Sequence, residues 1–222
     1  MSEQLLKAIL RLFALVAKED EVTHHERDQI KTFLQEHVSF SAVDTYLAVF
    51  DEFSRNLTPK TITLTADTKP ITELCNEVNT DLTQKQKVVI LLELISIIHA
   101  DGNISDRERE LLNIIGENFK INRSEIDAIM KFVLGAEPAQ LDHPQVMIVD
   151  AADDNAYANA QHIRRNHLKG FVAILYVQQA EFYFIKYLGN SDIYLNGVPV
   201  KSGRIGVLSF KFRTFSPKLI FT

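Results

Sequence analysis

The segment His99-Ala100-Asp101-Gly102-Asn103-Ile104-Ser105-Asp106-Arg107-Glu108 repeats the pattern of an earlier one, Ala17-Lys18-Glu19-Asp20-Glu21-Val22-Thr23-His24-His25-Glu26. Thr23 and Ser105 hold the same place in the two copies, 82 residues apart. Each copy follows an apolar run with helical spacing, residues 5–16 and residues 88–98, and each has a Glu three residues after its Thr or Ser. The repeat predicts a unit of helix, acidic turn and helix that is used twice, and therefore a duplicated helical domain.

The composition restricts the classes of function. The chain has 222 residues and a formal net charge of −5, which argues against a nucleic-acid partner because phosphate binding needs clustered Lys and Arg. No apolar run reaches about 18 residues, so we expect no membrane insertion by this chain, and the first residues do not resemble a signal peptide. The single cysteine, Cys75, permits no internal disulfide and favours a cytoplasmic location.

The periodicity of the apolar residues divides the chain into two parts. Apolar residues at helical spacing continue to about residue 134, whereas short β-type runs, with turns at Asn196-Gly197 and Ser202-Gly203, follow residue 144. The predicted fold class is α+β, with a helical bundle over residues 1–136 and a small antiparallel β domain over residues 145–222. The chain ends on an apolar run, and we expect it to be a fragment of something longer.

The acidic turns are candidate metal sites, but they do not match a standard EF-hand. That loop needs oxygen ligands at its positions 1 and 3, which fall on Ile97 and His99 in one copy and on Leu15 and Ala17 in the other. An open carboxylate site for calcium or magnesium is one interpretation. Its candidate metal ligands are Asp101, Glu108, Glu19, Asp20 and Glu26.

Helix capping is the alternative interpretation of the same residues. Thr23-x-x-Glu26 and Ser105-x-x-Glu108 are both capping-box patterns, and acidic residues in a first turn complement the helix dipole. Capping would occupy most of the local oxygens. We therefore expect a divalent cation to bind weakly or not at all, with Asp101 and Glu108 as its first ligands, and we expect no other cofactor.

No motif of a known enzyme class is present. The chain lacks His-Glu-x-x-His, Gly-x-Ser-x-Gly, Gly-x-Gly-x-x-Gly, Cys-x-x-Cys and the P-loop pattern. The sequence therefore predicts no catalytic and no cofactor-binding residues, and a protein that is not an enzyme.

The helix followed by Ala-Asp-Gly-x-Ile-Ser-x-x-Glu at Ala100–Glu108 and a second amphipathic helix resembles the TerB-like tellurite-resistance domain, which also occurs at the N-terminus of the DnaJ-like membrane protein DjlA. The resemblance covers about residues 3–135. It implies an internally duplicated all-helical bundle whose acidic turns are suspected metal sites. In the first copy, Asp20 stands where the pattern has glycine.

The stretch Asp192–Val200 with Ser202-Gly203 resembles a late hairpin of a forkhead-associated domain, a family that binds phosphothreonine. The recognition motifs of that family are missing from this chain. Only Arg164-Arg165 comes near the arginine cluster that phosphate recognition needs. The order of the two parts resembles the N-terminal region of certain bacterial ABC-transporter ATP-binding proteins. We therefore expect an interaction or regulatory module, at the front of a transporter ATPase or in an envelope-stress system, with a protein partner that could itself be membrane-associated. The alternative is a divalent-metal-binding stress sensor of the tellurite-resistance type.

Overall fold

The computed structural model describes residues 3–17, 22–56, 69–195, 197–208 and 219–221. The chain forms two compact units, residues 1–126 and residues 127–222. The first is helical and the second is built on β-sheet, so the fold class is α+β, as the sequence predicts.

Seven α-helices occur in the described residues, at the places where the apolar spacing predicts them. They are α1 (Glu3–Ala17), α2 (His24–His37), α3 (Val43–Asn56), α4 (Lys69–Asp81), α5 (Gln84–Ile98), α6 (Asp106–Asn118) and α7 (Arg123–Leu134). A short 3-10 helix, η3 (His99–Asp101), follows α5 directly. The Thr-rich stretch over residues 57–70, with Pro59 and Pro70, predicts a connector between helices. It lies almost entirely outside the described residues.

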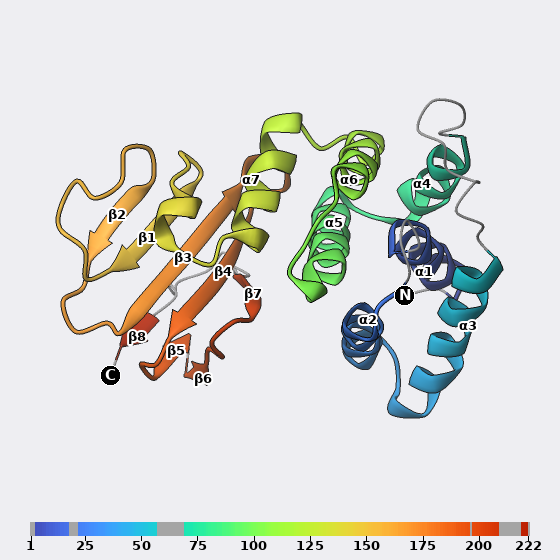
Figure 1. Cartoon of the computed structure of the whole chain (residues 1–222), viewed down its shortest axis with the longest axis horizontal. Helices are drawn as coiled ribbons and strands as arrows, with labels where there is room; N and C mark the ends of the chain where they lie inside the picture. Colours follow the sequence, from blue (N-terminus) through green and yellow to red (C-terminus); the bar gives the residue numbers. More distant parts are fainter. Residues whose placement is uncertain (1–2, 18–21, 57–68, 196, 209–218, 222) are drawn as a thin grey trace. The chain divides into compact units, whose positions relative to one another are not determined.

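Helix α1 forms the centre of the helical unit. It is apolar over most of its surface, as expected of a helix that packs against several others, while Glu3, Lys7 and Arg11 form a polar stripe that reaches solvent. It contacts α3, α4, α5 and α6 (Figure 1). Leu12 and Phe13 are fully buried, and the ring of Phe13 meets that of Phe33 edge to face at 5.0 Å. Because α1 precedes the first acidic turn and α5 precedes the second, the packing of α1 against α5 positions both turns.

The second unit contains a five-stranded sheet in the order β2-β1-β3-β4-β7. Its strands are β1 (Val146–Asp150), β2 (Gln161–Arg164), β3 (Gly170–Val177), β4 (Phe182–Gly189) and β7 (Ile205–Leu208). All neighbouring pairs are antiparallel except β1 and β2, which are parallel. A smaller antiparallel sheet joins β6 (Val198–Pro199), β5 (Ile193–Leu195) and β8 (Leu219–Phe221).

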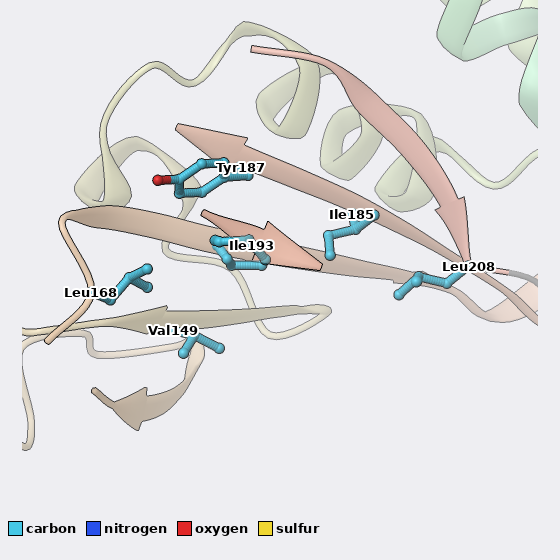
Figure 2. Close-up of a cluster of buried hydrophobic side chains, with 7 residues drawn as sticks. Val149, Leu168, Ile185, Tyr187, Ile193 and Leu208 are labelled. Atoms are coloured by element: carbon cyan, nitrogen blue, oxygen red, sulfur yellow. The ribbon is translucent and has the colours of Figure 1, made fainter. Parts of the chain in front are cut away.

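One face of the large sheet packs beneath β5. The buried side chains of this core come from five strands, four of the large sheet and β5, and from the β2–β3 connection. They are Val149, Leu168, Val172, Ile185, Tyr187, Ile193 and Leu208. Figure 2 shows Ile193 of β5 and Leu168 among the side chains of the large sheet. Leu168 and Ile193 lie next to the loops at one end of the sheet, so this core also fixes those loops.

A buried lysine attaches the end of α7 to the opposite face of the sheet. The Nζ atom of Lys186 in β4 donates to the carbonyl oxygens of Phe132, Val133 and Gly135 at 3.2, 2.7 and 2.8 Å. These carbonyls belong to the C-terminal turn of α7, where helical partners are lacking. The ammonium therefore acts as a C-cap supplied by a strand.

The strands β2 and β8 were not expected from the sequence. Strand β2 reads Gln-His-Ile-Arg and lies mostly exposed at the edge of the sheet, so it has neither the apolar run nor the regular alternation that predicts a strand. The positive φ angles at Gly197 (82°) and Gly203 (79°) agree with the predicted turns, although Asn196 itself lies outside the described residues. None of the described helices is long and apolar enough to cross a membrane.

Candidate functional site

The first acidic turn ends in a capping box at the start of α2. The Thr23 hydroxyl oxygen accepts the amide of Glu26 at 3.2 Å. In return, Glu26 Oε2 accepts the Thr23 amide at 2.7 Å and the Thr23 hydroxyl at 3.0 Å. The predicted cap is therefore confirmed, and it fixes the Glu26 carboxylate beside the turn.

The second acidic turn repeats this geometry at the start of α6. The Ser105 hydroxyl accepts the amide of Glu108 at 3.2 Å, and Glu108 Oε2 accepts the Ser105 amide at 2.8 Å and the Ser105 hydroxyl at 2.9 Å. Gly102 closes η3 at φ 90°, a left-handed conformation that favours glycine. The Asp101 carboxylate accepts the amide of Asn103 at 3.0 Å and so folds over the turn.

The two turns, far apart in sequence, line one pocket. The pocket has a volume of about 200 Å³, and its lining comes from the end of α1, the start of α2, the second turn and the start of α6. The lining residues are Ala17, Thr23, Glu26, Asp101, Asn103, Ile104, Ser105 and Glu108. Three of the eight are acidic and none is basic. Among the described residues, the two copies of the repeat therefore contribute to one shared pocket.

Two of the three carboxylates that line this pocket are buried, whereas Asp101 is exposed. Glu26 and Glu108 are only 4% and 7% exposed. Burial raises the pKa of Glu26 against the opposing hydrogen bonds from Thr23, and the nearby carboxylates of Glu108 and Asp101 raise it further. A cation entering the pocket would relieve this repulsion, so the pocket is complementary to a single positive charge.

The structure brings together three of the five predicted metal ligands, Glu26, Asp101 and Glu108. The other two, Glu19 and Asp20, lie outside the described residues. Among the described residues, no group of three or more His, Cys, Asp or Glu side chains is arranged to hold a metal ion. The metal site stays a prediction.

The sequence interpretation missed a further carboxyl group in the helical unit, the partly buried Glu93 on α5. Burial raises its pKa to about 7, and Glu36 adds to the rise. Its signal in the sequence is a lone acidic residue within the apolar run of residues 88–98. A third capping box, between Thr83 and Gln86 at the start of α5, was also missed, although it follows the Thr-x-x-Gln pattern.

We predict that Ser105→Ala lowers the free energy of unfolding of the helical unit by about 1 kcal/mol, because it removes the cap of α6. Urea unfolding followed by far-ultraviolet circular dichroism measures the change. Ser39→Ala is the matched control, since the Ser39 side chain makes no capping hydrogen bond to the short helix it precedes. Equal stability of the Ser105→Ala variant and the parent chain would contradict the capping role.

The family model of the tellurite resistance protein TerB matches residues 6–131, which is more than half of the chain. The match spans both acidic turns and helices α1 to α6. No curated protein and no solved structure matches the chain. With its repeated helical unit and paired acidic turns, the chain belongs to the TerB family of tellurite-resistance proteins.

Proposed function

We propose that this chain is a non-enzymatic regulatory and interaction module of the tellurite-resistance type. It acts in the cytoplasm through a protein partner, binds no nucleic acid and does not itself insert into a membrane. The acidic pocket of the helical unit is the surface through which it responds to a cationic group.

The convergence of Glu26, Asp101 and Glu108 on one pocket carries this proposal. Charges that are partly withdrawn from water interact more strongly than exposed ones, because the surrounding dielectric constant is lower. The pocket is small, and its carboxylates come from the capped starts of α2 and α6 and from Asp101 at the end of η3. The pocket can therefore accommodate one ammonium or guanidinium group of a partner protein, whereas a broad basic surface of a partner would not fit into it.

The hydroxyl groups beside these carboxylates support a binding role rather than a catalytic one. Thr23 and Ser105 each donate to a glutamate, an arrangement that also occurs in activated nucleophiles. However, each hydroxyl oxygen also accepts the amide of the third helical residue. Both hydroxyls are thereby held against the backbone as helix caps, and we assign them a structural role.

A divalent-cation sensor is the second candidate, and the same convergence of carboxylates favours it. Calcium takes about six to eight oxygen ligands. Glu26 and Glu108 each hold one oxygen on their own helix cap, and Asp101 holds one on the Asn103 amide. The described carboxylates do not complete such a ligand set, so a divalent cation would bind weakly, with Asp101 and Glu108 as its first ligands.

A titration of the nitrogen-15-labelled chain separates the two candidates. Calcium chloride, magnesium chloride and a short acetylated peptide with a single lysine are added in turn, and the amide signals of Thr23, Glu26, Ser105 and Glu108 are followed. We expect the lysine peptide to shift these signals, and we expect Asp101→Asn to weaken its binding because a charge of the pocket is lost. Asp44→Asn, an exposed first-turn acid on α3, is the control.

Micromolar affinity for calcium that is lost in Asp101→Asn would make the sensor the leading function. If none of the three cations shifted these signals, the acidic pocket would not be a cation site and both candidates would be rejected. We expect millimolar affinity for calcium and magnesium, because the described ligand set is incomplete.

The order of the helical unit and the β unit along the chain supports a proposal for the cellular setting. A TerB helical unit followed by a small β unit resembles the front of certain ABC-transporter ATP-binding proteins, and we propose that setting or an envelope-stress system. In that setting, the full chain would co-purify with an ATPase whose activity changes on Asp101→Asn. Unchanged ATPase activity in the variant would contradict the regulatory link.

A further inference from the structure

Positive charge gathers in the second unit, although the chain as a whole is acidic. Residues 1–126 carry 14 Lys and Arg against 21 Asp and Glu. Residues 161–208 carry six Lys and Arg against only Glu181 and Asp192. Of these six, Lys186 is buried beneath α7, and the other five are exposed.

The sheet topology brings most of them to one end. Strands β2 and β4 end there, and β3 and β7 begin there, because β3 runs antiparallel to β4 and β4 antiparallel to β7. Three connections therefore meet at this end, residues 165–169, residues 190–192 and residues 200–204. Their exposed basic residues, which we call the basic rim, are Arg165, Lys169, Lys201 and Arg204, with His167 beside them. Glu181 lies in the β3–β4 turn, at the other end.

Hydrogen bonds join the first two connections to each other and the third connection to the end of β4. The Lys169 amide donates to Ser191 Oγ at 2.9 Å, and the Asn190 amide donates to the Lys169 carbonyl oxygen at 2.9 Å. The Gly189 amide donates to Ser202 Oγ at 3.2 Å. Below these loops, Leu168 and Ile193 lie in the hydrophobic core (Figure 2). The rim is therefore held in a fixed arrangement before any ligand binds, which lowers the entropy cost of binding.

The charges of the rim are not neutralised by the described part of the unit. Of the neighbouring basic residues, Arg164 lies 3.1 Å from the Asp153 carboxylate and is left out of the rim for this reason. Among the described residues, no salt bridge joins Lys169, Lys201 or Arg204 to a carboxylate. The rim thus presents several cations on adjacent loops, with Asp192 as the one acidic side chain in those loops.

We propose that the basic rim is a docking surface for an acidic segment of a protein partner, one that carries several Asp or Glu carboxylates. Neighbouring strands lie about 4.8 Å apart, so cations on separate loops match carboxylates spread along an extended segment better than a single compact anion. A long nucleic acid is disfavoured, because residues 1–126 of the same chain carry the excess of acidic residues given above and would repel it. This proposal names the partner chemistry for the interaction role proposed above, but it concerns a different surface.

The test uses the full chain and a fluorescently labelled, acetylated octapeptide of alternating Glu and Ser. Binding is measured by fluorescence anisotropy at low and at raised salt. We expect weak, salt-sensitive binding, since exposed charge pairs are screened by salt. The double variant Lys169→Glu with Arg204→Glu is expected to weaken binding by about tenfold or more, because two attractive contacts become repulsive.

The matched control is Lys31→Glu with Lys131→Glu, which changes the net charge by the same amount at exposed positions that do not belong to the rim. We expect it to weaken binding by less than about threefold. Equal losses in the two double variants would show that only net charge matters and would overturn the proposal. Full displacement of the peptide by inorganic phosphate at constant ionic strength would overturn it too, since the rim would then be a phosphate site.

Two further outcomes would contradict the acidic protein segment as occupant. Tighter binding of a single-stranded oligonucleotide or of phosphatidylglycerol vesicles through the same residues would assign the rim to a polyanion or a membrane. If the chain self-associated in sedimentation experiments in a salt-sensitive way, and if the Lys169→Glu with Arg204→Glu variant did not, the rim would instead bind a second copy of the chain. Because the rim and the acidic pocket lie in different units, failure of this test leaves the titration of the pocket unaffected.

Discussion

Replacing Lys186 with Met destabilises the sheet unit by about 3 kcal/mol, the largest single effect that we expect. The substitution leaves the carbonyls of Phe132, Val133 and Gly135 buried without their donor. Each unsatisfied buried polar group costs about 1–3 kcal/mol. Burial lowers the pKa of the Lys186 ammonium to about 8, while the three carbonyls and the negative end of the helix dipole favour its charged form. At neutral pH the ammonium is therefore the form that caps α7.

Tyrosine fluorescence can follow this effect separately from the helical unit. Five of the six tyrosines, Tyr157, Tyr176, Tyr183, Tyr187 and Tyr194, belong to the sheet unit, and the chain has no tryptophan. We expect the urea midpoint measured by tyrosine fluorescence to fall in Lys186→Met. Lys131→Met, at an exposed position of the same helix, should leave it nearly unchanged. A midpoint equal to that of the parent chain would show that the helix end does not need this donor.

The second large effect concerns Glu93, whose substitution by Gln should stabilise the helical unit at alkaline pH but not at acidic pH. Burial, and then repulsion from Glu36, raise the pKa of Glu93 from its ordinary value of 4.5 to about 7. Between pH 4.5 and about pH 7, Glu93 therefore keeps its proton in the folded chain, whereas it has lost this proton in the unfolded chain. The contribution of this group to stability is therefore fully present below about pH 4.5 and is lost as the pH rises through 7.

Each pKa unit corresponds to about 1.4 kcal/mol, so we expect Glu93→Gln to raise the free energy of unfolding at pH 8 by about 2–3 kcal/mol. Urea unfolding at pH 5 and at pH 8, followed by far-ultraviolet circular dichroism, measures the difference. Glu36→Gln should stabilise less, because burial is the larger cause of the shift and remains in that variant. Equal effects of Glu93→Gln at the two pH values would contradict the raised pKa.

The candidate site could be predicted in its local parts. Thr23 and Ser105 bond to glutamates three residues further along, and such short-range contacts depend on a few neighbouring residues only. The same reasoning could have found the Thr83 cap. The convergence of the two caps on one pocket involves residues 82 positions apart, and it depends on how α1 and α5 pack.

The sequence by itself determined the helices, the capped starts of α2 and α6, the glycine turns and the change from helices to strands, because each follows from contacts or periodicity within a few residues. Only the tertiary structure decided the rest. Lys186 and Val133 are 53 residues apart, and no local pattern marks a strand lysine as the cap of a helix. Likewise, the basic rim exists because the sheet order brings three separate loops to one end. Such placements depend on the burial of apolar faces shared by distant segments, which no single stretch of sequence contains.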